Sequence, residues 1–299
     1  MHKKRRHLFK RTLTAALAAI LFAAALALGT GAASAWPRGE ITDRVHSHYE
    51  NIPVSVQSGG TRISDCYLIK EITYAPLRSF ADAVCPDAEV SFNAATRTAY
   101  VNANGLWLIV TEGSHYIVAN GRYLYADTPA VILDDGRMYV PIRSLARALG
   151  VGIEWNYTSR SILVTGSYAP ILSGDKFYRE DEVYWLSRII SAESRGEPLL
   201  GQIAVGNVVL NRQRSPDFPN TIWGVIFDRK WGVQFSPVQN GSVYAEPYYL
   251  SVVAAKICLE GATVSERVMY FLEPSKATSA WIPNNRTFAF KIGNHYFYY

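Results

Sequence analysis

Ser191-Ala-Glu-Ser-Arg-Gly-Glu-Pro198 is the stretch on which the fold of the second half depends. Upstream of it, apolar residues recur at helical spacing from Val183 to Ile190, and Glu193 falls on the same stripe. Gly196 predicts the end of that helix. A partly desolvated carboxyl at the negative end of a helix dipole favours its protonated form. Glu193 is therefore predicted to be a general acid of the kind that glycosidic-bond cleavage requires.

A second helix is predicted directly after this stretch, starting at Pro198. Its sequence from Gly201 to Arg212 is apolar almost all round, which indicates the central buried helix of a domain. Asn207 and Asn211 interrupt the apolar surface, and we expect them to bond to neighbouring loops rather than to catalyse. Glu197 is the nearest rival to Glu193, but its place ahead of a proline is typical of a helix start, with Arg195 as a partner.

The segment Trp231–Val238 has no helical period and contains Gly and Pro, which predicts a loop. Gln234 both donates and accepts hydrogen bonds, so it suits the acetamido or hydroxyl group of a sugar in a cleft. Phe235 is either a stacking face for a sugar or a core residue, and Trp231 is expected in the core. Ser236 is the third candidate from this loop for binding substrate.

The chain closes in a predicted hairpin whose turn is Gly293-Asn294. With a two-residue turn Ile292 faces His295, which places His295 on an apolar face. Such a histidine is either a satisfied core residue or a further substrate-binding group. Together with short helices at 221–227 and 247–260 and strands at 267–272, 287–292 and 295–299, this predicts an α+β fold, mainly helical with a small C-terminal sheet, for residues 182–299.

The first half contains an internal duplication. Tyr74-Ala-Pro-Leu-Arg-Ser-Phe80 and Tyr139-Val-Pro-Ile-Arg-Ser-Leu145 match, and each is followed by a short helix and by a hairpin with an Asn-containing turn, at 90–101 and 153–164. The predicted unit is strand, helix and hairpin, used twice over about 52–166. Residues 167–181 carry Pro, Ser and Gly with little periodicity and are expected to be a linker.

The N-terminal 35 residues are predicted to be a secretory signal peptide. Basic residues precede an apolar run and the pattern Ala33-Ser34-Ala35. The alternative is a retained membrane anchor. Removal of this segment takes six basic and no acidic side chains, so the net charge falls from +5 to −1 and overall basicity gives no argument for nucleic-acid binding.

Cysteine and histidine usage indicates neither a disulfide scaffold nor a metal centre. The chain has three cysteines, of which Cys66 and Cys85 allow a bridge after export, whereas Cys258 is expected to be a buried thiol on an apolar helix. His46 and His48 form a lone pair in an expected linker, and no zinc-ligand set accompanies them. We expect no metal and no cofactor.

Two family resemblances follow from these motifs. The repeated Tyr-x-Pro-[Leu/Ile]-Arg-Ser and [Phe/Trp]-Asn elements resemble the copper amine oxidase N-terminal-like (stalk) domain, and no copper site accompanies them. The series Ser-Ala-Glu-Ser-Arg-Gly-Glu-Pro, Gly-Gln-Ile-Ala-Val-Gly-Asn-Val-Val-Leu-Asn-Arg, Phe-Pro-Asn-Thr-Ile, Gln-Phe-Ser-Pro-Val and Gly-Asn-His-Tyr-Phe-Tyr resembles the spore-cortex-lytic cell-wall hydrolase family, SleB-like.

The second resemblance implies a lysozyme-like catalytic fold and a lytic transglycosylase that acts on peptidoglycan. Glu193 matches the family's catalytic Glu and would form 1,6-anhydro-N-acetylmuramic acid ends. The alternatives are a hydrolytic muramidase, an amidase, which the lack of a zinc-ligand set disfavours, and a non-catalytic wall-binding protein. The implied location is outside the cell, in the cell wall or spore envelope, with cortex and vegetative wall both open as targets. Peptidoglycan is the expected partner, without nucleic acid or stable membrane insertion after signal cleavage.

Overall fold

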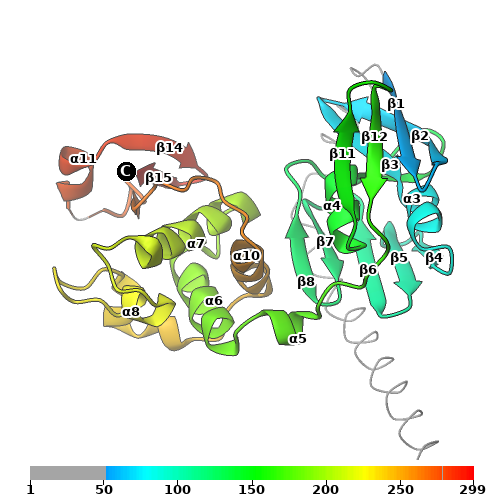
Figure 1. Cartoon of the computed structure of the whole chain (residues 1–299). Helices are drawn as coiled ribbons and strands as arrows, with labels where there is room; N and C mark the ends of the chain where they lie inside the picture. The colour runs from blue at the N-terminus through cyan, green and yellow to red at the C-terminus, as the bar shows by residue number, and fades with distance from the viewer. Residues whose placement is uncertain (1–51, 278) are drawn as a thin grey trace, which may run out of the picture. The chain divides into compact units, whose positions relative to one another are not determined.

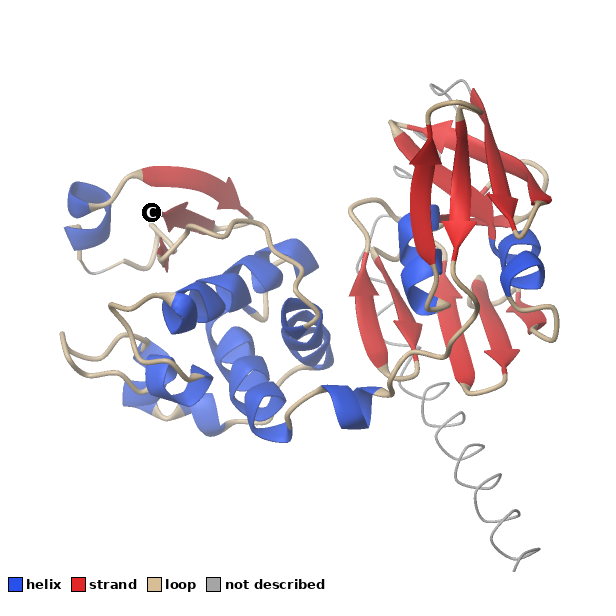
Figure 2. Ribbon diagram, viewed as in Figure 1, coloured by secondary structure: helices blue, strands red, loops and turns tan. Residues whose placement is uncertain are grey.

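The computed structural model describes residues 52–277 and 279–299 (Figure 1). All of them belong to one compact unit. The predicted signal peptide and the His46 and His48 pair lie outside the described residues. Strands dominate the first half of the described chain and helices the second (Figure 2), which confirms the mixed α+β class. In the described part of the chain, no helix has the length and apolar character that a membrane crossing needs.

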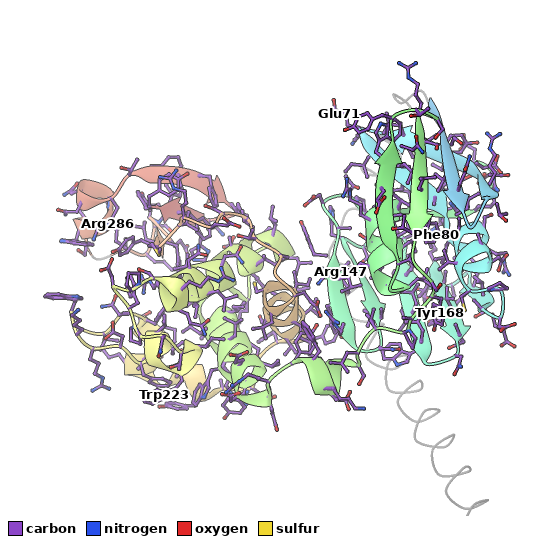
Figure 3. The ribbon with its side chains drawn as sticks, viewed as in Figure 1. Glu71, Phe80, Arg147, Tyr168, Trp223 and Arg286 are labelled. Atoms are coloured by element: carbon purple, nitrogen blue, oxygen red, sulfur yellow. The ribbon has the colours of Figure 1, made fainter. Side chains whose placement is uncertain are left out.

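The first half contains two sheets and two helices that share one core. Phe80, labelled in Figure 3, and Leu145 are fully buried in that core. The larger sheet has the order β11 (Gly152–Asn156), β12 (Ser161–Thr165), β1 (Ile52–Ser58), β2 (Thr61–Ile69), β3 (Ile72–Pro76), β10 (Met138–Pro141) and β9 (Val131–Ile132). The smaller has β4 (Glu89–Asn93), β5 (Thr98–Ala103), β6 (Leu106–Thr111), β7 (Tyr116–Ala119) and β8 (Arg122–Tyr125), and the helices are α3 (Leu77–Val84) and α4 (Ile142–Ala148).

The two Tyr-x-Pro segments pair with each other in the larger sheet. Tyr74 lies opposite Pro141 and Tyr139 opposite Pro76, so the tyrosine of each copy faces the proline of the other across the antiparallel pair. Each proline is the N-cap of its helix, α3 or α4, where its missing N–H costs no hydrogen bond. Each following hairpin turn is closed by an Asn side chain that accepts two backbone N–H groups, Asn93 in one and Asn156 in the other.

The three cysteines are free and buried. The bridge that export would allow between Cys66 and Cys85 is therefore not formed. Burial raises the pKa of the Cys66 thiol to about 12, so it packs as a small apolar group. Cys258 is buried as predicted.

The second half is built around α7 (Leu199–Arg214), which is buried on every side and confirms the predicted central helix. The other helices of the second half are α5 (Gly174–Phe177), α6 (Glu180–Ser194), α8 (Ile222–Ile226), α9 (Ser236–Asn240), the 3₁₀ helix η1 (Ser242–Tyr244), α10 (Tyr249–Leu259) and α11 (Trp281–Asn285). A three-stranded sheet completes it in the order β13 (Tyr270–Leu272), β15 (His295–Tyr298) and β14 (Phe288–Ile292). Four short helices were not predicted: α5, within the expected linker, α9, η1 and α11. The predicted loop at Trp231–Val238 ends at Phe235, because α9 begins at Ser236.

Three helices meet closely at Gly206 of α7. A Cβ atom placed there would lie 2.7 Å from Sγ of Cys258 in α10 and 2.8 Å from Cδ1 of Ile190 in α6. Both distances are shorter than van der Waals contact, so any side chain at position 206 would force Cys258 or Ile190 to move. The crossing places the last turn of α6 beside the middle of α7.

The amide side chains of α7 bond to the loop that follows α10, as predicted. Asn207 donates to the carbonyl of Ala262 and accepts from the N–H of Val264, at 3.0 and 2.7 Å. Asn211 donates to the carbonyls of Ser265 and Val268, both at 2.9 Å. These bonds satisfy polar groups that burial would otherwise leave unpaired.

Glu260, at the end of α10, bonds to three side chains that come earlier in the chain, two of them from the first half. Its side chain is 0% exposed and accepts hydrogen bonds from Arg122, Arg147 and the Tyr178 hydroxyl at 2.7–2.8 Å. Arg147 is labelled in Figure 3. A buried carboxylate needs such compensation, because an unpaired one would cost several kcal/mol.

Substitution of Gly206 by Ala tests the helix crossing. The added methyl group has no space beside Ile190 and Cys258, so we expect a loss of about 1–3 kcal/mol in the free energy of unfolding, measured by denaturant titration. Gly196→Ala is the control, because a Cβ atom at Gly196 would have nothing within 4 Å and its φ is not positive. Equal stability of the two variants would contradict the close crossing.

Candidate active site

Glu193 lies in the last turn of α6, which ends at Ser194 with Arg195 as its C-cap. The helix end agrees with the stop predicted from Gly196. The neighbouring hydroxyls are engaged in local hydrogen bonds: Ser194 donates to the carbonyl of Ile190, and Ser191 accepts from the N–H of Tyr248. The side chain of Glu193 itself is partly buried, neither sealed in the core nor fully in solvent.

The protonation of Glu193 is set by two opposing effects. Burial is the larger and raises the pKa of the carboxyl, while the positive charge of Arg212 lowers it, and the result is a pKa of about 7. A carboxyl group with this pKa is protonated in a large fraction of molecules near neutral pH. It can therefore give a proton and take one back, as a general acid and base must.

Arg212, near the end of α7, is a candidate for the site that our sequence reasoning missed. It is 5% exposed, and its Nε donates to the carbonyl of Met269 at 2.8 Å. Its guanidinium lies 5.1–5.3 Å from the ring centres of Phe218, Phe235 and Tyr270. The available signal was a charged residue next to the long apolar run of α7, which resembles the signal that identified Glu193.

Tyr270 of β13 joins this cluster to the last part of the chain. Its hydroxyl accepts from Nη2 of Arg286 at 3.0 Å, and the Arg286 guanidinium lies 4.6 Å from the Tyr270 ring centre. Arg286, labelled in Figure 3, also lies 4.9 Å from the ring centre of Trp281. The ring of Tyr270 therefore contacts two cations, with Arg212 as the other.

Glu197 has a different role from the one we expected. It is buried and does not pair with Arg195: its two carboxylate oxygens accept from the backbone N–H and from Nδ2 of Asn294, both at 3.0 Å. The carboxylate of Glu197 thus binds and stabilises the Gly293-Asn294 turn. Both of its oxygens accept hydrogen bonds from Asn294, which gives Glu197 a structural role at this turn.

His295 is buried next to Glu197. Its Nδ1 lies 3.8 Å from Oε1 of Glu197, and its ring packs edge-on to Phe271. Burial lowers the pKa of the imidazole, and the nearby Glu197 charge raises it. The register is as predicted, with Ile292 opposite His295. Its 4% exposure places the ring in the domain interior rather than at an open surface.

The three candidates on the loop before α10 have different surroundings. Gln234 is partly exposed and its Nε2 donates to the carbonyl of Gly232, while Ser236 is exposed at the start of α9. Phe235 is 3% exposed and lies in the core against Arg212, so its ring is not an open stacking face for a sugar. Trp231 is 80% exposed, and our expectation of a core position for it is wrong.

Two hollows in the described surface do not include Glu193. One of about 360 Å³ is lined by Asn207, Arg214, Gly261, Ala262, Thr263 and Glu266. The other, of about 170 Å³, lies between the starts of α6 and α8 and is bordered by Trp185 and by Trp223, labelled in Figure 3. The charge that acts on Glu193 is that of Arg212, which lines neither hollow.

Comparisons with known families identify two domains. Residues 196–298 match the family model described as Cell Wall Hydrolase, and residues 64–164 match the Copper amine oxidase N-terminal domain. Both resemblances that the motifs predicted are therefore confirmed. The first match begins three residues after Glu193.

Individual relatives agree with the cell wall hydrolase match. The spore cortex-lytic enzyme of Bacillus cereus is 38% identical over 120 residues, which cover 40% of this chain and 45% of that protein. The enzyme of the same name from Bacillus subtilis is 36% identical over 120 residues and is covered to 38%. The chain thus spans less than half the length of these relatives. The solved catalytic domain of the germination-specific lytic transglycosylase SleB from Bacillus anthracis is 36% identical, with a TM-score of 0.38, over 43% of this chain and 100% of that one.

Glu193→Gln tests the raised pKa through protein stability. An acid whose pKa rises on folding loses stability as the pH increases from its ordinary value of 4.5 through about 7, here by at most about 3 kcal/mol. Gln carries no charge, so the variant should melt above the wild type at pH 8, and the difference should shrink toward pH 5. A difference that does not change with pH would contradict the buried acid.

Gly293→Ala tests the bond between Glu197 and the hairpin turn. Gly293 has a φ of +56°, and a Cβ there would collide with Oε2 of Glu197. Gly232→Ala is the matched control, because Gly232 also has a positive φ but nothing within 4 Å. Both variants bear about 1 kcal/mol of backbone strain. Gly293→Ala should lose clearly more stability in denaturant titration, and equal losses would count against the Glu197 contact.

Proposed function

We propose that this chain, whose residues 196–298 match the cell wall hydrolases, is a secreted enzyme that cleaves the glycan strands of peptidoglycan as a lytic transglycosylase. One observation carries the proposal: a partly buried carboxyl on Glu193, with a pKa of about 7, three residues before the matched segment. The name that the Bacillus relatives share, spore cortex-lytic enzyme, supports a substrate in the spore envelope or cell wall.

The proposed reaction needs only one carboxyl group. Protonated Glu193 donates its proton to the glycosidic oxygen between N-acetylmuramic acid and N-acetylglucosamine, and the bond from that oxygen to C1 of the muramoyl residue breaks. The resulting carboxylate then takes the proton of the muramoyl 6-hydroxyl while O6 bonds to C1. The products are a free 4-hydroxyl and a 1,6-anhydro end. No water is consumed, and Glu193 recovers its proton.

A hydrolytic muramidase is the second candidate, because Asp228 offers another carboxylate near the site. Asp228 lies in the loop after α8 and acts electrostatically on Arg212, as Glu193 does. In a hydrolase, a second carboxylate serves as the base that activates water or as a nucleophile. In the transglycosylase, Asp228 has no chemical step to perform.

The other parts of the chain receive roles that follow from this activity. Residues 1–35 would direct export to the cell wall or spore envelope, and 182–299 would form the catalytic domain with a lysozyme-like arrangement. The duplicated segment 52–166, joined through 167–181, would space the enzyme from the wall or attach it there. Gln234 and Ser236 are proposed to contact substrate, while Phe235 and His295 support the site from within the core.

Digestion of purified peptidoglycan with residues 36–299 tests the reaction class. Mass spectrometry of the released muropeptides should show anhydro ends, and Glu193→Gln should slow their release by about 10²- to 10⁴-fold. Asp228→Asn should leave both rate and product type unchanged.

Other outcomes would replace the proposal. Reducing ends that disappear in Asp228→Asn would establish a hydrolase. Free stem peptides would indicate an amidase. Binding to peptidoglycan without any release would make the chain a wall-binding protein.

A further inference from the structure

Arg212 is a buried cation whose hydrogen bonding is incomplete. Its Nη1 is buried without a hydrogen-bond partner, and no ion pair within the described residues joins Arg212 to a carboxylate. The aromatic rings around it compensate part of the desolvation, because each presents its π electrons to the cation. A buried guanidinium held in this way costs stability, so the fold alone gives little reason to keep it.

The titratable groups that face Arg212 come from three neighbouring elements. They are Glu193 from α6, Asp228 from the loop after α8, and Tyr270 from β13. The helices α9 and η1, which also pack on α6, carry no charged side chain. The one charged side chain of α10, Lys256, lies over Tyr123 and Tyr178 instead. Arg212 is therefore the cation that acts on Glu193.

The absence of a direct ion pair within the described residues matters for the chemistry. An arginine bonded to a carboxylate holds its pKa well below the ordinary value, and such a group cannot act as an acid near neutral pH. Arg212 instead acts on Glu193 without an ion pair at 4 Å or less, so the carboxyl stays free to bond to the substrate.

We propose that Arg212 is the positioning residue of this site, and that its buried guanidinium stabilises the carboxylate that Glu193 becomes when its proton passes to the glycosidic oxygen. The inference rests on the proposed function and deepens it. Without Arg212, a negative charge would develop at a partly buried position with no counter-charge, which would make Glu193 a weaker acid in the first step.

Arg212→Met removes the charge and keeps an apolar stem of similar length. We expect the rate of peptidoglycan cleavage to fall at least about tenfold, and the alkaline limb of its pH profile to move up by roughly 0.5–1 pH unit. Arg212→Lys keeps the charge and should lie between the wild type and Arg212→Met. Arg214→Met, an exposed arginine at the end of the same helix, is the control and should leave the pH profile in place.

A stability cycle with Glu193→Gln tests the coupling without activity. At pH 8 the fall in Tm caused by Arg212→Met should be larger with Glu193 present than with Gln at that position, and at pH 5 the two falls should agree. An equal fall at both pH values in both backgrounds would overturn the proposal and assign Arg212 a purely structural role.

Two further results keep the test decisive. If Arg212→Met does not fold, Arg212→Gln, which also removes the charge, takes its place: the carboxyl titration of Glu193, followed by ¹³C NMR, should shift upward, and an unchanged titration would overturn the proposal. If Glu193→Gln retains full lytic activity, the proposed function fails, yet the stability cycle still measures whether positions 193 and 212 are coupled.

Discussion

The structure of the second half depends on the burial of α7 from Gly201 to Arg212. A helix covered on every side leaves no route to water for its polar side chains, so each must find a partner in the protein. Gln202 donates to the carbonyl of Glu197 and accepts from the Ser251 hydroxyl. Asn207 and Asn211 donate hydrogen bonds to the loop after α10 and fix it against α7. The central helix thereby fixes the segments around it as well as the apolar core.

The sequence was sufficient where local pattern determines structure. Helical periodicity identified α6, α7 and α10, and the two-residue turn identified the register of the last hairpin, because these features depend on residues close in the chain. Glu193 was found because a carboxyl on an apolar stripe conflicts with burial. Arg212 is also a charged residue at a buried position. A basic residue near the end of a helix is usually explained by the helix dipole, so its sequence position did not mark it as unusual.

The rest required tertiary contacts that no local pattern contains. Glu197 bonds to Asn294, 97 residues away, so the residues next to Glu197 in the sequence do not indicate its role. Phe235 and Trp231 lie four residues apart in a segment without periodicity, and nothing in the segment shows that the first is buried and the second exposed. The short helix α11 contains a proline and lies between strands, where propensity alone does not favour it.

The small sheet also has an order in time. Its middle strand, β15, follows β13 and β14 in the sequence, and among the described strands each of those two pairs with β15 alone. During synthesis, β13 and β14 have no partner strand until residues 295–298 leave the ribosome. Asn294, to which Glu197 bonds, is synthesised equally late. The domain that carries Glu193 therefore closes late. If the chain is exported as proposed above, late closure would keep this segment unfolded during passage through a narrow channel, and the site around Glu193 would assemble only after the membrane has been crossed.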